Sequence, residues 1–124
     1  DFWMPFTPSI LNEHINKIIH NPKKIYSPFM TVAFDTRKKF INKIPGVIHP
    51  ADKTTRPQML KKNINPDYHD LIKEFYKITN IPLLLNTSFN LNGEPVVMTP
   101  EDALRTFYSC GLDILVLNDY VIYK

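Results

Sequence analysis

Two clusters of polar side chains have the composition of a ligand site, and the first of them follows an apolar run. Asn86-Thr87-Ser88-Phe89-Asn90 brings two amides and two hydroxyls directly after residues 81–85, which read as a buried strand. Open sheets bind ligands just beyond the carboxyl ends of such strands, where fixed donors can grip a phosphate or a carbonyl group. The same residue types also form ordinary Asn/Ser turns, so spacing alone leaves both interpretations open.

The second cluster is residues 49–58, a segment with almost no apolar content. It contains His49, Asp52, Lys53, Thr54, Thr55, Arg56 and Gln58. The Arg56 guanidinium can clamp a phosphate with two hydrogen bonds, and Thr55 and Gln58 can orient that phosphate. Pro57 stiffens the backbone beside Arg56, which a flexible loop would not need. The alternative interpretation is a solvated surface loop.

Other reactive residue types form no recognisable catalytic pattern. The histidines at positions 14, 20, 49 and 69 lack the H-x-x-x-H and H-E-x-x-H spacings, so we expect no metal site in this chain. His14, His20 and His69 fall in helical patterns and are expected on the surface. Ser88 lacks the G-x-S-x-G turn of a hydrolase nucleophile, and Cys110 is expected to pack as a core residue.

Composition restricts the function class. The chain has 124 residues, 15 Lys and Arg against 12 Asp and Glu, one Cys and three Gly. A net charge of +3 is too small for a duplex-binding stripe but suits a small anionic ligand. Three scattered glycines build neither a P-loop nor a G-x-G-x-x-G turn. One cysteine and no apolar run of about 20 residues predict a cytoplasmic protein without a membrane span. The aromatic-rich start without an initiator Met suggests a piece of a longer protein.

The elements that must position these clusters alternate between strands and helices, so the predicted class is α/β (α+β) in a single domain. Hydrophobic spacing predicts a helix from Ser9 to Asn21, and caps predict helices starting at Asn65 and at Thr99, the latter ending at Gly111. Strands are predicted at 29–34 and 47–48, and a strand buried on both faces is predicted at 81–85. A helical turn is predicted at 36–43, and a loop or edge strand at 50–58. Residues 114–117 and 120–123 are predicted to form a hairpin.

Six blocks of sequence also resemble a known family in their order along the chain. They are PFTPSIL (5–11), SPFM (27–30), HPADKTTRPQ (49–58), NTSFNLNGEPVV (86–97), TPEDALRTF (99–107) and GLDILVLNDY (111–120). This order is similar to that of the C-terminal domain of NodU/CmcH-type O-carbamoyltransferases. The resemblance spans nearly the whole chain, and NTSFN-x-x-GEP is its most distinctive block. Residues 1–124 are therefore interpreted as part of that domain.

The resemblance implies a YrdC-like fold, a twisted mixed sheet flanked by helices. It implies that this domain takes carbamoyl phosphate and ATP as substrates and forms carbamoyl-adenylate. A separate N-terminal TsaD-like domain of the same protein, which carries the metal ion, then transfers the carbamoyl group to a hydroxyl. By position, Arg56 and Ser88 fall where the family grips carbamoyl phosphate or the adenylate. Thr55, Gln58, Asn86 and Asn90 would line the same pocket.

Two departures from the family pattern affect these expectations. The family form is H-x-D-G-T-A-R-x-Q, whereas here one extra residue separates His49 from Asp52 and Lys53 replaces the glycine. Asp52, Thr54, Arg56 and Gln58 still align, which leaves the role of His49 open. The family domain begins with a segment like E-x-G-P-R-A-L-G, which does not occur here. We therefore expect the isolated chain to lack catalytic activity.

Two other function classes stay open at this level. One is a non-catalytic module of the same fold that binds nucleotide or RNA through short basic clusters such as Lys61-Lys62. An RNA-binding module would show a steep salt dependence and would need those lysines. The other is a structural module that only packs against a second domain, in which Arg56 and Ser88 would be replaceable.

Overall fold

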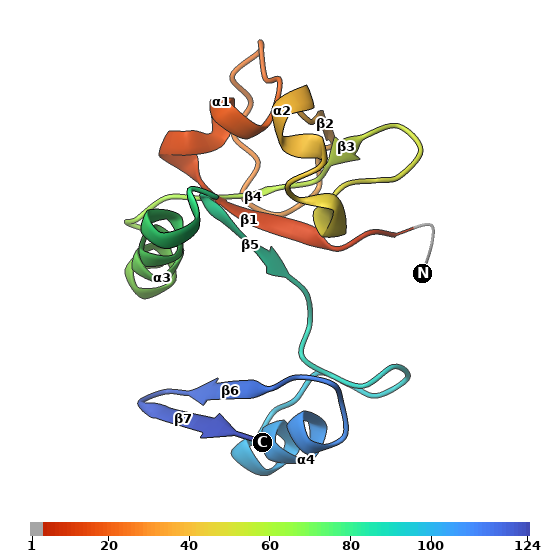
Figure 1. Cartoon of the computed structure of the whole chain (residues 1–124), viewed down its shortest axis with the longest axis vertical. Coiled ribbons are helices and arrows are strands. Elements are labelled where there is room, and N and C mark those ends of the chain that lie inside the picture. Colours follow the sequence, from red (N-terminus) through yellow and green to blue (C-terminus); the bar gives the residue numbers. More distant parts are fainter. Residues whose placement is uncertain (1–3) are drawn as a thin grey trace. The chain divides into compact units, whose positions relative to one another are not determined.

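The computed structural model describes residues 4–124, and these form two compact units (Figure 1). Unit 1 extends to Thr87 and unit 2 comprises Ser88–Lys124. Each unit has helices and strands, so the predicted mixed α/β class is confirmed. The expectation of one domain over residues 1–124 stays a prediction. No helix among the described residues has both the length and the apolar character needed to cross a bilayer.

The central strand of unit 1 is β1, Thr7–Leu11, and it corrects the predicted helix from Ser9. It pairs in parallel with β4, Gln58–Leu60, and antiparallel with β5, Leu83–Asn86, so the sheet is mixed, as predicted. The helical spacing of the apolar residues was misleading because strand pairing with two distant segments outweighs local periodicity. Helical structure begins only at η1, Asn12–His14, and α1, Ile15–Ile18.

Alternate residues of β1 enter different clusters because a strand points successive side chains to opposite faces. Ile10 packs in a large cluster with α1 and α2, Lys38–Ile41. Leu11 packs with Leu60 and with Ile72 of α3, Pro66–Thr79. Figure 1 shows α3 on one side of this sheet and α1 and α2 on the other. Both faces of β1 are therefore covered, and the strand is the core of unit 1.

The segments between α1 and β4 are mostly short elements. The strand predicted at 29–34 is present only at its last residue, because β2 is Phe34–Asp35. It pairs with β3, Thr54–Thr55. The helical turn predicted at 36–43 is confirmed as α2, with Phe40 buried. The strand predicted at 47–48 is wrong, because Val47 ends the 3₁₀ turn η2, Pro45–Val47. Proline at its first position presets the helical φ angle.

Helix α3, Pro66–Thr79, is the longest described helix and begins as its sequence predicts. The Asn65 side chain accepts a hydrogen bond from the Tyr68 N–H at 3.1 Å, and Pro66 occupies the first position. The helix ends at Asn80, whose φ of 58° is left-handed. The following strand is not buried on both faces as predicted, because β5 lies at the sheet edge and leaves Leu85 46% exposed.

His69 is a further correction, since it is 4% exposed rather than on the surface. Its Nε2 lies 2.8 Å from a Glu13 carboxylate oxygen and its Nδ1 lies 3.4 Å from Asp70. Asp70 also accepts a hydrogen bond from the Lys62 ammonium at 3.0 Å. These polar contacts join α3 to η1 and to the segment after β4. A helical-wheel position could not reveal them because they depend on long-range packing.

We expect this cluster to make folding stability sensitive to acid. Burial raises the pKa of Glu13, but hydrogen bonds from its own backbone and from His69 outweigh burial and leave that pKa lowered. The Lys62 hydrogen bond, followed by that of His69, lowers the pKa of Asp70. Lowered carboxyl pKa values stabilise the fold above the ordinary value of about 4, and this contribution is lost as pH falls through the folded-state values.

The measurement is urea unfolding of the wild type and of the Glu13→Gln, Asp70→Asn double variant. The free-energy difference between them should be present at about pH 5.5 and should be smaller at about pH 3. An unchanged difference at the two pH values would contradict this assignment.

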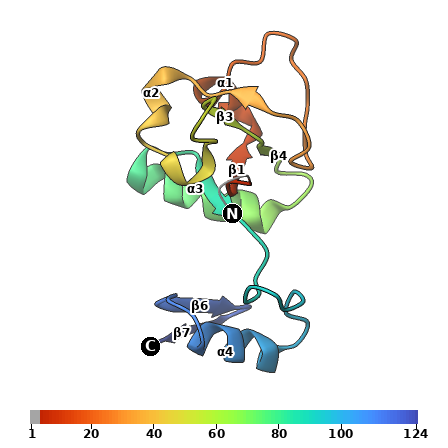
Figure 2. The ribbon, with the colours of Figure 1, turned by 90° about the vertical axis from the view of Figure 1, so that its right-hand side faces the viewer.

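Unit 2 consists of a helix packed on a hairpin (Figure 2). Helix α4, Pro100–Tyr108, begins at the predicted cap, where the Thr99 hydroxyl accepts from the Asp102 N–H at 3.1 Å. It ends at Tyr108, three residues before the predicted Gly111. The predicted hairpin is confirmed as β6, Ile114–Leu117, and β7, Tyr120–Tyr123. Phe107 and Leu115 are the centre of the cluster between them.

Candidate functional site

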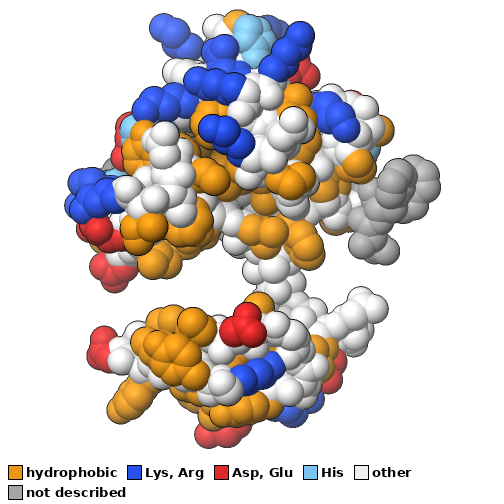
Figure 3. Space-filling view, in the orientation of Figure 1, with side chains coloured by type: hydrophobic (Ala, Val, Ile, Leu, Met, Phe, Trp, Pro, Cys, Tyr) orange, Lys and Arg blue, Asp and Glu red, His pale blue; other side chains and the backbone are white. Residues whose placement is uncertain are grey.

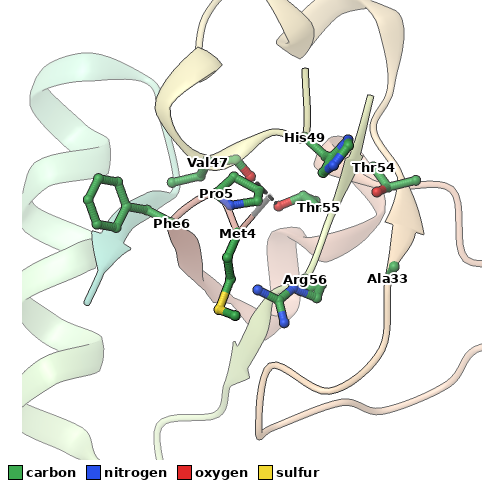
Figure 4. A pocket seen from close by; sticks show the side chains of 9 residues that line it. All are labelled: Met4, Pro5, Phe6, Ala33, Val47, His49, Thr54, Thr55 and Arg56. Carbon is green, nitrogen blue, oxygen red and sulfur yellow. Dashed lines mark hydrogen bonds between the residues drawn. The ribbon is translucent and has the colours of Figure 1, made fainter. Parts of the chain in front are cut away.

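The candidate site is a pocket of about 290 Å³ in unit 1. Figure 4 shows the side chains that line it, which come from the segments before β1 and before β2, the turn η2 and the residues around β3. Apolar side chains such as Pro5, Phe6 and Val47 line part of it. Its polar lining comes from His49, Thr54, Thr55 and Arg56. The second cluster predicted from sequence therefore borders a cavity and is not merely a solvated loop.

Arg56 is the residue in this pocket best suited to hold an anion. The residue is half-buried, and its guanidinium points towards the Met4 side chain in Figure 4. Within residues 4–124, no side chain or carbonyl group pairs with the guanidinium. A half-buried guanidinium normally has a carboxylate or phosphate partner, because removing its charge from water is costly. The pocket thus presents an uncompensated positive charge.

The segment before Arg56 has a rigid local structure. Asp52 accepts hydrogen bonds from the Thr54 N–H at 2.9 Å and from the Thr54 hydroxyl at 2.8 Å. The backbone hydrogen bond has the largest effect in lowering the pKa of Asp52, followed by the hydroxyl hydrogen bond. The electrostatic effect of His49 lowers this pKa less. The Thr55 hydroxyl donates to the Val47 carbonyl at 2.7 Å, so Thr55 fastens β3 to η2 (Figure 4). Arg56 therefore directly follows a strand whose position is fixed by hydrogen bonds.

Gln58 and Asn86, predicted from separate clusters, lie together on the sheet. Asn86 Nδ2 donates to the Ser9 hydroxyl at 3.0 Å and to Gln58 Oε1 at 3.1 Å, and the Ser9 hydroxyl donates to Gln58 Oε1 at 2.6 Å. Ser9 is fully buried on the central strand and joins the other two. The amide nitrogen of Gln58 and the amide oxygen of Asn86 have no partner among the described residues. One donor and one acceptor are thereby left for a ligand.

Arg56 lies at the same end of the sheet as this amide pair. Gln58 begins β4, Asn86 ends β5, and the pocket residues Met4–Phe6 lead into β1. A residue that precedes proline is restricted to extended conformations, so Arg56 continues the direction of β4 through Pro57. The structure thus brings Thr55 and Arg56 to one pocket, and Gln58 and Asn86 to the adjoining strand ends.

Ser88 and Asn90 belong to unit 2. Ser88 is exposed. The Asn90 side chain donates to the carbonyl groups of Leu91 at 2.9 Å and of Glu94 at 3.1 Å, so it shapes the loop 90–94. Gly93 in this loop has φ of 83°, a conformation that favours glycine. The Asn/Gly spacing of this block thus has a structural reason, and the ligand roles of Ser88 and Asn90 stay predictions.

Ser9 is the site residue that the sequence did not reveal. Its only local signal is a small hydroxyl within an apolar strand. The partners that make it useful are 49 and 77 positions away in the chain, so only strand register identifies it. Among residues 4–124, no three His, Cys, Asp or Glu side chains gather as a metal ion would require. The arrangement can bind an anion at Arg56 and a polar, amide-sized group at Gln58 and Asn86.

Comparison with known proteins supports the resemblance predicted from sequence. The chain is 46% identical to an uncharacterized protein of Methanocaldococcus jannaschii, covering 99% of this chain and 23% of the relative. It is 41% identical to the nodulation protein NolNO of Sinorhizobium fredii, over 98% of this chain and 18% of that relative. It is 37% identical to the nodulation protein NolO of Bradyrhizobium diazoefficiens, over 98% of this chain and 22% of that relative.

The chain spans about a fifth of the length of these curated relatives. The family described as carbamoyltransferase C-terminus matches residues 1–124. The match over the whole chain, together with the nodulation proteins, confirms the predicted family. This chain is therefore a member of the carbamoyltransferase C-terminus family.

Proposed function

We propose that this chain is the C-terminal part of an O-carbamoyltransferase and that unit 1 binds carbamoyl phosphate. The observation that carries the proposal is the half-buried Arg56 guanidinium, unpaired within residues 4–124, in a pocket of about 290 Å³. Carbamoyl phosphate joins a dianionic phosphate to a primary amide. Arg56 offers two hydrogen bonds to the phosphate, while Gln58 and Asn86 offer a donor and an acceptor that complement the amide.

The reaction that we propose has two steps in this part of the protein. Hydrolysis of carbamoyl phosphate gives carbamate and inorganic phosphate. A carbamate oxygen then attacks the α-phosphorus of ATP, which forms carbamoyl-adenylate and releases pyrophosphate. Both steps develop negative charge on phosphate oxygens, and a fixed guanidinium with amide donors stabilises that charge. Ser88 is assigned to the same ligands by the family resemblance alone.

Transfer to the acceptor belongs to another part of the protein. An acceptor hydroxyl attacks the carbonyl carbon of carbamoyl-adenylate, which yields the O-carbamoylated product and AMP. As the family resemblance implies, we assign this step to a metal-bearing TsaD-like domain outside residues 1–124, for which the much longer relatives leave room. A YrdC-like fold and a cytoplasmic location are part of the same proposal. Carbamate and the mixed anhydride are unstable in water, so a closed pocket would protect them.

The test is exchange of labelled pyrophosphate into ATP by the full-length, metal-loaded protein. We expect exchange that requires carbamoyl phosphate, because only carbamoyl-adenylate formation releases pyrophosphate reversibly. Omitting carbamoyl phosphate is the control, and the isolated chain is expected to give no turnover. A folded full-length protein without exchange would refute adenylate chemistry and favour a non-catalytic nucleotide- or RNA-binding module.

A further inference from the structure

A second pocket lies at the opposite end of β1 and β4, the one parallel pair among the described strands. Its volume is about 300 Å³. Asn12 and Asn16, which follow β1, and Lys61, which follows β4, line it together with Lys24 and Tyr26. It therefore lies beyond the carboxyl ends of two parallel strands, the place where open sheets commonly bind ligands.

This pocket is separate from the one at Arg56. Arg56 comes just before β4 and Met4–Phe6 just before β1, whereas the second pocket is lined by Met59 within β4 and by residues that follow β1 and β4. Five residues of β1 at about 3.3 Å each separate the two ends of the sheet. The two pockets share no lining residue, so a ligand can bind in one while the other is empty.

The second pocket is positively charged. Lys24 and Lys61 line it, and no Asp or Glu does. Within residues 4–124 neither ammonium forms an ion pair, and Lys61 Nζ lies 4.0 Å from the centre of the Tyr26 ring. Residues 15–62 contain eleven Lys or Arg and only two Asp. Figure 3 shows Lys and Arg gathered over the α1 and α2 region of unit 1, so the surrounding field also attracts anions.

The remaining lining residues define the uncharged part of the ligand. The Asn21 side chain is not available to a ligand, because it forms two hydrogen bonds with the Ile25 backbone, at 2.8 and 3.0 Å. The Asn12 and Asn16 side chains have no partner within the described residues and can bond hydroxyl groups. Ile15 and Met59, both buried, add an apolar part to the lining.

From these observations we propose that the second pocket binds a phosphorylated small molecule with a hydroxylated body, such as a sugar phosphate or a nucleotide. The phosphate lies between Lys24 and Lys61, and the hydroxyl groups bond Asn12 and Asn16. The site is independent of the proposed carbamoyl phosphate pocket, so either assignment can fail without the other.

The experiment is calorimetric titration of the full-length protein carrying Arg56→Ala, which removes the anion ligand of the first pocket. The probes are ribose 5-phosphate, AMP and unphosphorylated ribose. We expect ribose 5-phosphate to bind and ribose not to bind. Tighter binding of AMP than of ribose 5-phosphate that is weakened by Lys61→Ala would identify a nucleotide as the ligand of this pocket, and equal or weaker binding a sugar phosphate.

The decisive comparison is between neighbouring lysines. Lys61→Ala should weaken ribose 5-phosphate binding about tenfold or more, because a charge-assisted hydrogen bond is lost. Lys62→Ala is the matched control, since Lys62 pairs with Asp70 and does not line the pocket. Asn16→Leu, an exposed position, should weaken binding as well. No binding of ribose 5-phosphate, or equal losses in the Lys61 and Lys62 variants, would overturn the proposal.

Discussion

Replacing Arg56 by alanine is expected to reduce carbamoyl-phosphate-dependent pyrophosphate exchange by about 100-fold to 1000-fold, the usual effect of removing one preorganised donor from an anionic transition state. The guanidinium is half-buried and unpaired within residues 4–124, so its full charge is available to the substrate. Arg56→Lys should recover only part of the activity, because an ammonium group cannot form the paired, planar hydrogen bonds of a guanidinium.

The matched control for this variant is Arg105→Ala. Arg105 is exposed and is paired with Glu94 at 3.2 Å and with Asp102 at 3.8 Å, and exposed ion pairs contribute little to stability. We expect its exchange activity to stay near that of the wild type. Equal exchange in the wild type and the Arg56→Ala protein, with thermal unfolding unchanged, would show that Arg56 is not a substrate ligand.

Replacing Phe107 by alanine is expected to destabilise unit 2 by about 3–5 kcal/mol, the range for removing a buried aromatic ring. Phe107 is fully buried between α4 and the hairpin β6–β7. A unit as small as residues 88–124 is expected to have a total stability of only a few kcal/mol by itself. The variant should therefore lose the fold of α4 and of the hairpin.

Amide hydrogen exchange of the full-length protein measures this effect separately for each unit. In Phe107→Ala, amides of β6 and β7 should exchange rapidly while those of β1 stay protected. Tyr108→Ala is the control, since the Tyr108 side chain is 61% exposed and should change stability by less than about 1 kcal/mol. Protected hairpin amides in Phe107→Ala would show that the cluster is not what holds unit 2 together.

The same variant connects stability to the proposed site. Phe89, between Ser88 and Asn90, is partly buried and packs against the Phe107 cluster. The Val97 N–H also donates to the Phe89 carbonyl at 3.0 Å. Loss of the cluster should therefore release the loop that carries Ser88 and Asn90. Pyrophosphate exchange in Phe107→Ala would fall if these residues bind the adenylate, as the family resemblance implies.

The sequence by itself determined the elements whose signals are local. Asn65 with Pro66 and Thr99 with Pro100 mark the starts of α3 and α4, because a cap acts on N–H groups two or three residues away. Asn118 adopts the left-handed conformation that the predicted hairpin turn requires, with φ of 50°. The ordered sequence blocks likewise sufficed to identify the family.

Only the tertiary structure decided the features that depend on distant partners. Ile10 and Leu11 have helical spacing, yet they form a strand because β4 and β5 supply backbone hydrogen bonds on both sides. His69 is buried with its Nε2 against a carboxylate oxygen of Glu13, 56 positions earlier in the chain. Ser9 joins Gln58 to Asn86 through strand register alone. Local propensity is a weak preference, and hydrogen bonds and burial between distant segments outweigh it.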